Sequence, residues 1–418
     1  MPLTLAQADS ILMEWYEQPL RESVNNEVKA LKYLEQSSRQ WSGRRVIFSV
    51  HLGRGNSVGA RIERATLPAA LNQQAGEARI TSVYVYGRVQ LTGQAMKATK
   101  HAFADGLAYE MENLKNDLVN DLSRQAYGDG LGTLAQVALD SNSNSLVTVF
   151  NRFFEPGQNG ARYIEATQLL DAGTVANNDA DLASGNVISV TVLAVSSTTA
   201  DTITFSGTIS NLSQSDTFLF NYDIDQVEMM GFRALIDDGT AANIYGRSAG
   251  FFSNLLVQNI CATAFVRWQA AVLQNSGTER IIDSHLMQTS FDSVERNSGK
   301  VPDMIWGEYR TVSAFLDSLS GDRRFASKDF DAGRGQLTYN GKMLIADLNA
   351  PFNELYLTNK ECLHNYVLED TKWSSEDGAV LSRVANVDEF EAFLKTYRQL
   401  GVERRNGLAV IRDIRVDL

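Results

Sequence analysis

The sequence predicts an α+β fold in which a long two-stranded flap, a long amphipathic helix and a β-rich insertion follow one another. Apolar and polar residues alternate over 83–91, which predicts a strand. Apolar residues at spacings of three, four and seven predict a helix over 96–126. Short runs rich in Val, Ile, Thr and Phe between 186 and 235, separated by turn residues, predict a small sheet or barrel.

The composition is that of an ordinary globular protein. The chain has 418 residues, of which 44% are hydrophobic and 21% charged, and at roughly 150 residues per domain this length suggests two or three domains. Lys and Arg total 38 against 50 Asp and Glu, a formal charge of -12. Tight nucleic-acid binding depends on neutralising phosphates, so we expect at most weak contact with DNA.

The cysteines and the apolar runs bear on the compartment. Cys261 and Cys362 form no CxxC pair, so neither a zinc site nor a disulfide framework is expected. No run approaches the ~18 apolar residues of a membrane span, and Met1 to Glu17 carries acids, unlike a cationic secretory signal. We expect a soluble protein made in a cytoplasm, without membrane contact.

Residues 45–93 are predicted to form the flap. Val46–His51 is predicted to be a strand, and Val58–Glu63 could extend it beyond a glycine-containing joint. The small and polar stretch 67–76 would be a loose tip. Arms of ~15 to 20 residues at ~3.3 Å each reach roughly 50 to 65 Å, and an isolated hairpin is only marginally stable in water. We therefore expect a partner outside this molecule to hold the flap down.

The rest of the chain mixes both kinds of element. Gly128–Gly130 should end the long helix, whose acids (Asp105, Glu110, Asp117 and Asp121) would face solvent or a neighbour. Residues 250–275 look helical, and 355–357 looks like a strand. The end is ambiguous, because 390–397 has helical spacing whereas 410–416 has the pattern of a strand.

The order of these parts resembles the Hong Kong 97-like fold of tailed-phage major capsid proteins, over most of the chain. Each similar stretch is a packing or turn motif, and their order is more specific than any one of them. The stretches are Val58–Glu63 with Leu67 and Pro68, Tyr86–Arg88, Thr92 and Gly93, Asp322–Phe325, Asn340–Lys342, Leu355–Asn359, Trp373, Asp377–Val384, and Asn406 with Gly407.

The resemblance implies a division of the chain into named parts. They are an N-terminal arm over 1–44, an extended loop (E-loop) over 45–94, a peripheral P-domain over 95–164 with its spine helix at 96–126, the β-rich insertion over 165–235, an axial A-domain with connections over 236–364, and a closing segment over 365–418 that returns to the P-domain, largely as strands.

The resemblance also implies a function. Such a subunit assembles with copies of itself into the pentamers and hexamers of an icosahedral shell that encloses double-stranded DNA. Scaffolding and portal proteins, and decoration proteins in some cases, would be further partners. The protein would be assembled in the host cytoplasm and remain in the virion capsid.

The flap is where we expect contacts between subunits. Some members of the family cross-link an E-loop Lys to a neighbour, but no Lys occurs between Lys32 and Lys97. Arginine suits carboxylates, so we expect the flap to dock without a covalent bond on an acidic face of the next subunit. The expected contact residues are Arg54, Arg61, Arg64, Leu67, Pro68, Arg79, Tyr84, Tyr86 and Arg88, and Trp41 and Trp373 could be interface anchors or core residues.

Motifs for chemistry are weak. Gly246–Gly250 fits the GxSxG pattern around Ser248, but a glycine-rich turn is the simpler interpretation. Residues 53–58 do not complete GxGxxG, there is no GxxxxGK[ST] sequence, and the acidic loop Asn177–Asp181 lacks the EF-hand glycine and glutamate. His51, His101, His285 and His364 have no metal-binding spacing. We expect no catalytic residue, cofactor or metal.

Three alternatives remain open. An encapsulin-like nanocompartment would have the same fold around a protein cargo, although the β-rich insertion counts against it. A serine hydrolase would use Ser248. A phage tube or decoration protein would usually be shorter and would have little use for a helix of ~45 Å.

Overall fold

The structure is a computed structural model of the chain. None of the described helices is both long and apolar enough to cross a membrane. The model describes residues 29–37, 39–55, 57–92, 102–137, 141–151, 161–174, 188–196, 202–212, 217–222, 227–239, 256–262, 264–319, 338–375, 380–384 and 387–416.

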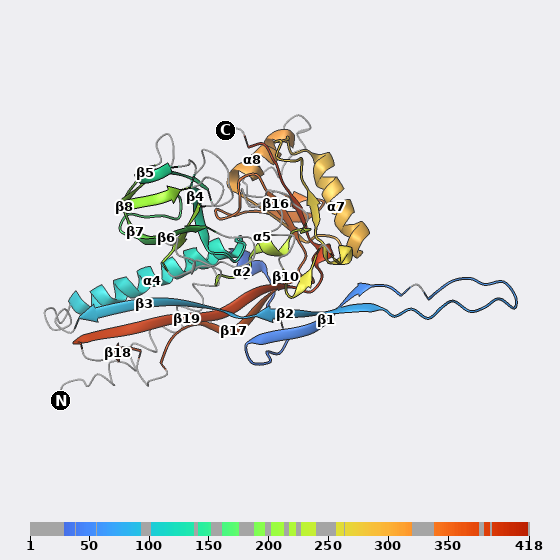
Figure 1. Ribbon diagram of the computed structural model, residues 1–418, viewed down its shortest axis with the longest axis horizontal. Helices are drawn as coiled ribbons and strands as arrows, with labels where there is room; N and C mark the ends of the chain where they lie inside the picture. The colour runs from blue at the N-terminus through green and yellow to red at the C-terminus, as the bar shows by residue number, and fades with distance from the viewer. Residues whose placement is uncertain are drawn as a thin grey trace, which may run out of the picture.

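A four-stranded antiparallel sheet, which we call the central sheet, runs along the lower side of the molecule in Figure 1. Its middle strand is β19 (Glu389–Val402), which pairs on one edge with β3 (Val83–Thr92). The other edge of β19 pairs with β17 (Leu363–Trp373) and with the short β18 (Ser382–Arg383). The late part of the chain therefore returns to residues 83–92.

This sheet corrects two expectations. Residues 83–92 do form a strand, but the strand pairs with β19 and not with the first strand of the flap. Residues 390–397 lie in β19, so their helical spacing was misleading and the strands implied by the family resemblance are confirmed there. A period of two identifies a strand but does not specify its partner.

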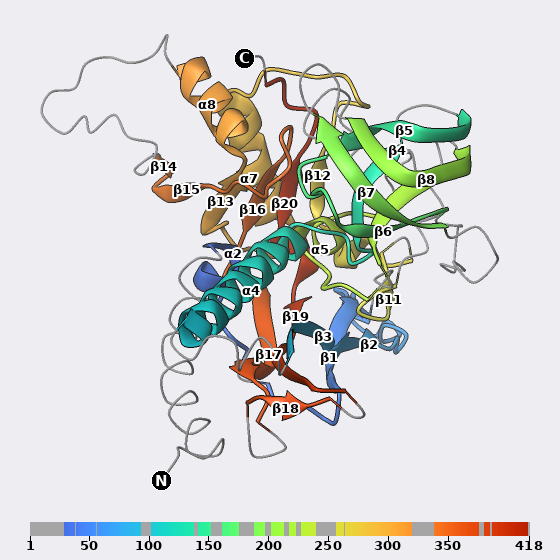
Figure 2. The same cartoon turned by 90° about the vertical axis from the view of Figure 1, so that its left-hand side faces the viewer.

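The spine helix α4 (Ala102–Ala126) packs across this sheet (Figure 2). Met111, Leu118 and Leu122 face the core as their spacing predicts. The helix ends before Gly128–Gly130, where Gly130 has a φ of 85°. Gly87 in β3 lets the helix come close, because a Cβ there would lie 3.1 Å from Leu114. Residues 96–101 of the predicted helix lie outside the described part, and the short α2 (Lys29–Tyr33) packs against α4.

The flap is a two-stranded hairpin with a long loop. β1 (Arg45–Gly53) pairs antiparallel with β2 (Gln74–Thr81), and β2 continues through the buried Ser82 into β3. We call residues 54–73 between the strands the tip loop. Val58–Glu63 forms no strand within it, contrary to expectation, because no strand among the described residues pairs with it and Gly59 weakens its strand pattern.

The β-rich insertion is a closed six-stranded barrel with an apolar interior. It begins at β4, so the expected boundary at residue 165 is wrong, and β4 and β5 belong to the barrel and not to the region of the spine helix. Polar residues dominate the start of β5, which hides its strand pattern. In ladder order the strands are β4 (Thr133–Val137), β5 (Ser141–Asn151), β8 (Thr202–Leu212), β7 (Ile188–Ser196), β6 (Leu169–Thr174) and β9 (Thr217–Asn221).

A six-stranded mixed sheet lies beside the barrel in Figure 2. It is the third folded body of the molecule, after the central sheet with α4 and the barrel. Helices α7 (Ser284–Ser298) and α8 (Tyr309–Ser318) cover one face of it, which presents Ile305 and Leu357. The opposite face presents Trp306 and Tyr356 to the main core. In order the strands are β12 (Ala271–Leu273), β20 (Ala409–Ile411), β16 (Leu355–Thr358), β13 (Met304–Gly307), β15 (Lys342–Ala346) and β14 (Thr338–Tyr339).

Two further expectations are corrected here. The end of the chain does not stay with the central sheet, because η6 (Arg405–Gly407) leads β20 between β12 and β16. Its run of buried apolar residues suits a strand that is covered on both faces. The described part of 250–275 contains no α-helix but β10 (Leu256–Val257), β11 (Ile260–Cys261), the 3₁₀ turn η3 (Val266–Trp268) and β12.

The bodies meet at the short helix α5 (Phe232–Leu235). The ring of Phe232 lies 5.1 Å from that of Tyr127, at the end of α4, and 5.8 Å from those of Trp306 and Tyr356 in the six-stranded sheet. A Cβ on Gly231 would lie 2.4 Å from the Gln125 carbonyl oxygen, so only glycine fits this crossing. The junction thereby ties the spine helix to the six-stranded sheet.

Candidate assembly surfaces

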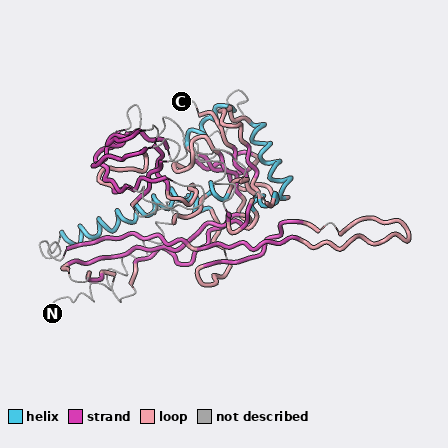
Figure 3. The backbone as a smooth tube through the Cα atoms, in the orientation of Figure 1, coloured by secondary structure: helices cyan, strands magenta, loops and turns pink. Residues whose placement is uncertain are grey.

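The tip loop projects beyond the rest of the molecule (Figures 1 and 3). Four of its apolar side chains are exposed, with Val58 at 92%, Ile62 at 83%, Leu67 at 81% and Leu71 at 55%. Isolated exposed apolar residues are normal, but a group of them on one projecting segment indicates a contact surface. Of these four residues, only Leu67 was an expected contact residue, together with its neighbour Pro68. The recurrence of apolar residues in an otherwise polar loop is the sequence signal for the other three.

The tip loop has internal structure. The Ser57 hydroxyl donates to the Leu71 carbonyl at 2.9 Å and accepts from the Leu71 amide at 2.8 Å, which holds the two sides together. At the far end, the Arg61 side chain donates to the carbonyls of Thr66 and Ala60, both at 3.0 Å. Arg64 has a φ of 65° at the turn. A defined loop of this kind can present a fixed surface.

The five predicted arginines fall into three places. Arg54, Arg61 and Arg64 are exposed on the tip loop. Arg79 lies in β2 and pairs with Glu77 at 2.6 Å. Arg88 lies in the central sheet, where it pairs with Glu391 at 2.7 Å. The structure thus concentrates positive charge at the tip and removes Arg88 from the flap.

Tyr84 and Tyr86 also belong to the central sheet. Both rings meet Tyr397 edge to face, with centroids 4.8 and 5.9 Å away. The Tyr86 hydroxyl donates to that of Tyr397 at 3.1 Å, and this bond, together with burial, raises the pKa of Tyr86 to about 12. The pair forms a partly exposed aromatic patch on β3, separate from the tip loop.

Both candidate tryptophan anchors pack within their own chain. The Trp41 indole donates to the Val367 carbonyl at 3.1 Å and packs against the apolar cluster under the flap. Trp373 is buried in the main core. These contacts favour the core interpretation of the two residues.

Two acids form an acidic row on one exposed side of α4. Glu110 and Asp117 are exposed and lie seven residues apart, so they share a face, whereas the exposed Glu112 lies on another side of the helix. Asp121 faces the end of the helix and pairs with Arg124 at 2.6 Å. The acidic row gives α4 the negative charge that a basic tip loop would need in order to bind there.

Catalytic chemistry finds little support among the described residues. No three His, Cys, Asp or Glu side chains there are placed to hold a metal ion. Burial raises the pKa of the Cys362 thiol to about 11, which makes it a poor nucleophile at neutral pH. Ser248, His101, the loop Asn177–Asp181 and the stretch Asp322–Phe325 lie outside the described residues.

Comparison by sequence finds no relative: no protein-family model and no curated protein matches the chain. Comparison by structure does. The capsid asymmetric unit of cyanophage A-1(L) aligns over 93% of this chain and 93% of that chain, with a TM-score of 0.56 and 13% identity. The chain has the fold of a phage capsid protein. Its mixed α and β architecture agrees with that fold.

Other solved capsids align less well. The capsid of an empty GTA particle covers 93% of the chain and 90% of its own, with a TM-score of 0.48 and 7% identity. An encapsulin from Synechococcus elongatus PCC 7942 covers 39% of the chain and 57% of its own, with a TM-score of 0.27 and 12% identity. Likenesses at these scores add nothing to the assignment of the capsid fold.

Proposed function

We propose that this protein is a major capsid protein, which assembles with copies of itself into the pentamers and hexamers of an icosahedral shell around double-stranded DNA. The observation that supports this most directly is the projecting tip loop with its exposed apolar side chains. Nothing in its own chain covers this surface among the described residues. A capsid fold with an uncovered arm suits a protein that is completed by its neighbours.

The parts of the shell subunit follow from the described bodies. We assign the extended E-loop to β1, the tip loop and β2, and the P-domain to α4 with the central sheet. The six-stranded sheet with α7 and α8 would be the A-domain, which meets other A-domains at the centre of each pentamer or hexamer. Residues 1–44 would be the N-terminal arm, and the barrel would be the insertion.

The flap would dock without a covalent bond. Its tip is basic, through Arg54, Arg61 and Arg64, and the acidic row on α4 offers carboxylates on a neighbouring copy. Apolar contact would contribute most of the affinity, whereas complementary charge would set the register and speed the encounter. Closed symmetry repeats each modest contact many times, so that the whole shell is stable.

The further partners would be those of a virus particle. Scaffolding and portal proteins would direct assembly in the host cytoplasm, and decoration proteins could bind the finished virion capsid. Packaged DNA would be contacted weakly, because a chain with a formal charge of -12 repels phosphate.

The proposal is tested by shortening the flap. Since Ser57 and Leu71 already face each other, residues 58–70 can be replaced by a two-residue Asn-Gly turn without disturbing β1 and β2. We expect a folded chain that stays as monomers or small oligomers under conditions in which the full chain forms shells. Wild-type-like shells from the shortened chain would overturn the proposed role of the tip loop.

A matched pair of substitutions separates contact from folding. Ile62→Ser with Leu67→Ser removes two exposed apolar side chains from the tip loop, whereas Leu146→Ser with Leu193→Ser removes two from the barrel, where they are 57% and 59% exposed. Only the first pair should prevent closed shells in electron micrographs. An equal loss from both pairs would point to a general effect of lost apolar surface.

A further inference from the structure

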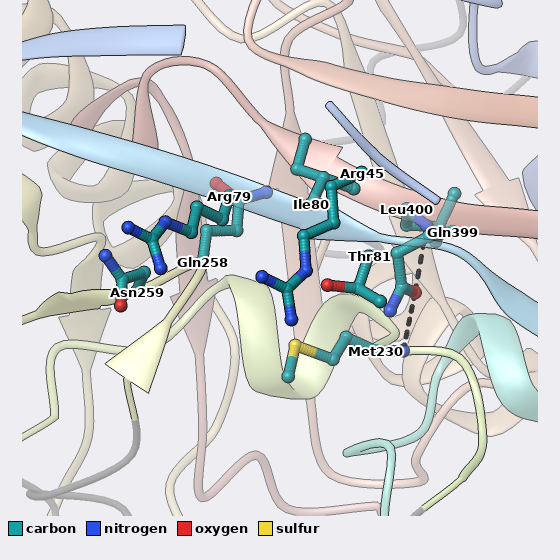
Figure 4. Close-up of a pocket in the computed structure, with 9 residues that line it drawn as sticks. All are labelled: Arg45, Arg79, Ile80, Thr81, Met230, Gln258, Asn259, Gln399 and Leu400. Carbon is teal, nitrogen blue, oxygen red and sulfur yellow. Dashed lines mark hydrogen bonds between the residues drawn. The ribbon is translucent and has the colours of Figure 1, made fainter. Parts of the chain in front are cut away.

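A pocket of about 280 Å³ lies at the root of the flap, where β2 passes over the junction of the bodies (Figure 4). We call it the root pocket. Its walls come from β1, β2, the turn between β10 and β11, the segment before α5, and β19. The lining residues are Arg45, Arg79, Ile80, Thr81, Met230, Gln258, Asn259, Gln399 and Leu400.

Arg45 extends into the middle of this pocket (Figure 4). Its side chain makes no hydrogen bond or ion pair with the described residues, and its Nε is buried without an acceptor. The side chain as a whole is half-buried, and a buried donor such as this Nε normally has an acceptor. The Arg45 guanidinium is therefore placed to bind an anionic group that enters the pocket.

Arg79 and Gln399 add further donors to the root pocket, while Thr81 and Asn259 also carry acceptor oxygens. The Nε–H of Arg79 donates to Glu77, which leaves the two terminal nitrogens of Arg79 as further donors. The Gln399 side-chain oxygen accepts from the amides of Met230 at 2.9 Å and Leu400 at 3.2 Å, which leaves its NH₂ group to donate. Among the described residues no carboxylate lines the root pocket itself, whereas Asp129 and Glu228 line the hollow beside it. Donors on apolar walls without a counter-charge are the environment that a carboxylate or a phosphate prefers.

A second hollow of about 550 Å³ lies beside the root pocket and shares Thr81, Met230 and Gln399 with it. This hollow follows the chain from Ser82 to Tyr84, where β2 passes into β3. Its volume is larger than a small ion needs.

We propose that the root pocket receives an acidic side chain from a second copy of this chain, with Arg45 as its ion partner. The inference rests on the proposed self-assembly and adds a specific contact to it. Two observations select a second copy as the source. The chain carries 50 acidic against 38 basic residues, so a neighbour offers many carboxylates. The pocket is also continuous with β1 and β2, whose tip loop is the proposed docking segment.

The test uses a cross-linker that acts only at direct contact. Arg45→Lys places an amine in the root pocket, and a water-soluble carbodiimide then joins that amine to any carboxylate touching it. Arg44→Lys is the matched control, because Arg44 is the preceding residue and is exposed. Shells are assembled from equal amounts of ¹⁵N-labelled and unlabelled chains, treated, and digested for mass spectrometry.

We expect roughly ten-fold more inter-chain product at position 45 than at position 44, the ratio that a modest preference for contact would give. One acidic peptide should dominate the product and so identify the partner residue. Equal yields at the two positions, or products formed only within one chain, would overturn the root-pocket contact.

The test also separates this contact from the proposed function. If the unsubstituted chain forms no shells with or without its scaffold, the proposed function fails. If shells form and position 45 shows no enrichment, only the root-pocket contact fails. A folded Arg45→Lys chain that does not assemble, beside an Arg44→Lys chain that does, would support the contact, because lysine cannot reproduce the planar fork of arginine.

Discussion

At the scale of single residues, Arg124 holds the end of the spine helix in place. Its buried guanidinium donates to the carboxylates of Asp121 and Glu228, and Glu228 lies on the segment that leads into α5. Burial alone would lower the pKa of Arg124, but the two carboxylates raise it overall, so the charge persists at any physiological pH. The sequence shows these residues as isolated charges, since nothing local indicates that 124 and 228 meet.

Replacing Arg124 with Met should therefore destabilise the unassembled chain strongly. The change leaves Glu228 buried without its cation, and breaking a buried pair in this way costs about 3 to 5 kcal/mol. Lys300→Met is the control, since Lys300 and Glu361 pair at 2.5 Å on the surface, where such pairs contribute about 0 to 1 kcal/mol. Urea unfolding of both variants measures the difference, and similar losses would contradict this account of the junction.

At the scale of elements, the sequence predicts strands and the long helix well but their partners poorly. The alternation in 83–91 correctly indicates a strand, yet β19, which pairs with it, lies about 300 residues further along the chain. Within β19 the apolar residues imitate a helix, because both faces of its later part are buried. The barrel is recognisable from 186 onward, but its first three strands, β4, β5 and β6, are too short or too polar to stand out.

The candidate contact surface was predictable in part. The exposed arginines of the tip could be named from the sequence, since charge without a local partner indicates solvent or a neighbour. The apolar side chains of the same loop were not recognised, because exposure depends on the absence of a covering element. Arg45 was missed as well, since the root pocket is assembled from five separate segments of the chain.

Reversing the charge of the flap should block assembly without unfolding the chain. The variant combines Arg61→Glu, Arg64→Glu and Arg79→Glu. It places acids where a neighbour's acidic row would lie, and a loss of about 1.4 kcal/mol of binding free energy at one contact already lowers its affinity ten-fold. The control substitutes Arg267, Arg296 and Arg404 with Glu, which are exposed on other elements. Light scattering follows shell formation and circular dichroism follows folding. Particles like those of the unsubstituted chain from the flap variant would remove the basic flap from the account.

At the scale of the whole molecule, three folded bodies surround one junction, and one arm extends away from all of them (Figure 1). Each body has an apolar cluster of its own or shares the main one, whereas the tip loop has none. In the proposed function, this contrast has a simple cause: the arm would acquire a covered apolar surface against another copy. The central claim is therefore that the protein completes its structure by closed self-assembly.

The measurement that tests this claim most directly is negative-stain electron microscopy of the full chain after a sizing column, expressed alone and together with candidate scaffolding proteins. The account predicts closed shells of uniform diameter, or the pentamer and hexamer rings from which they are built. A single species of 46.2 kDa under every salt and scaffold condition would contradict it.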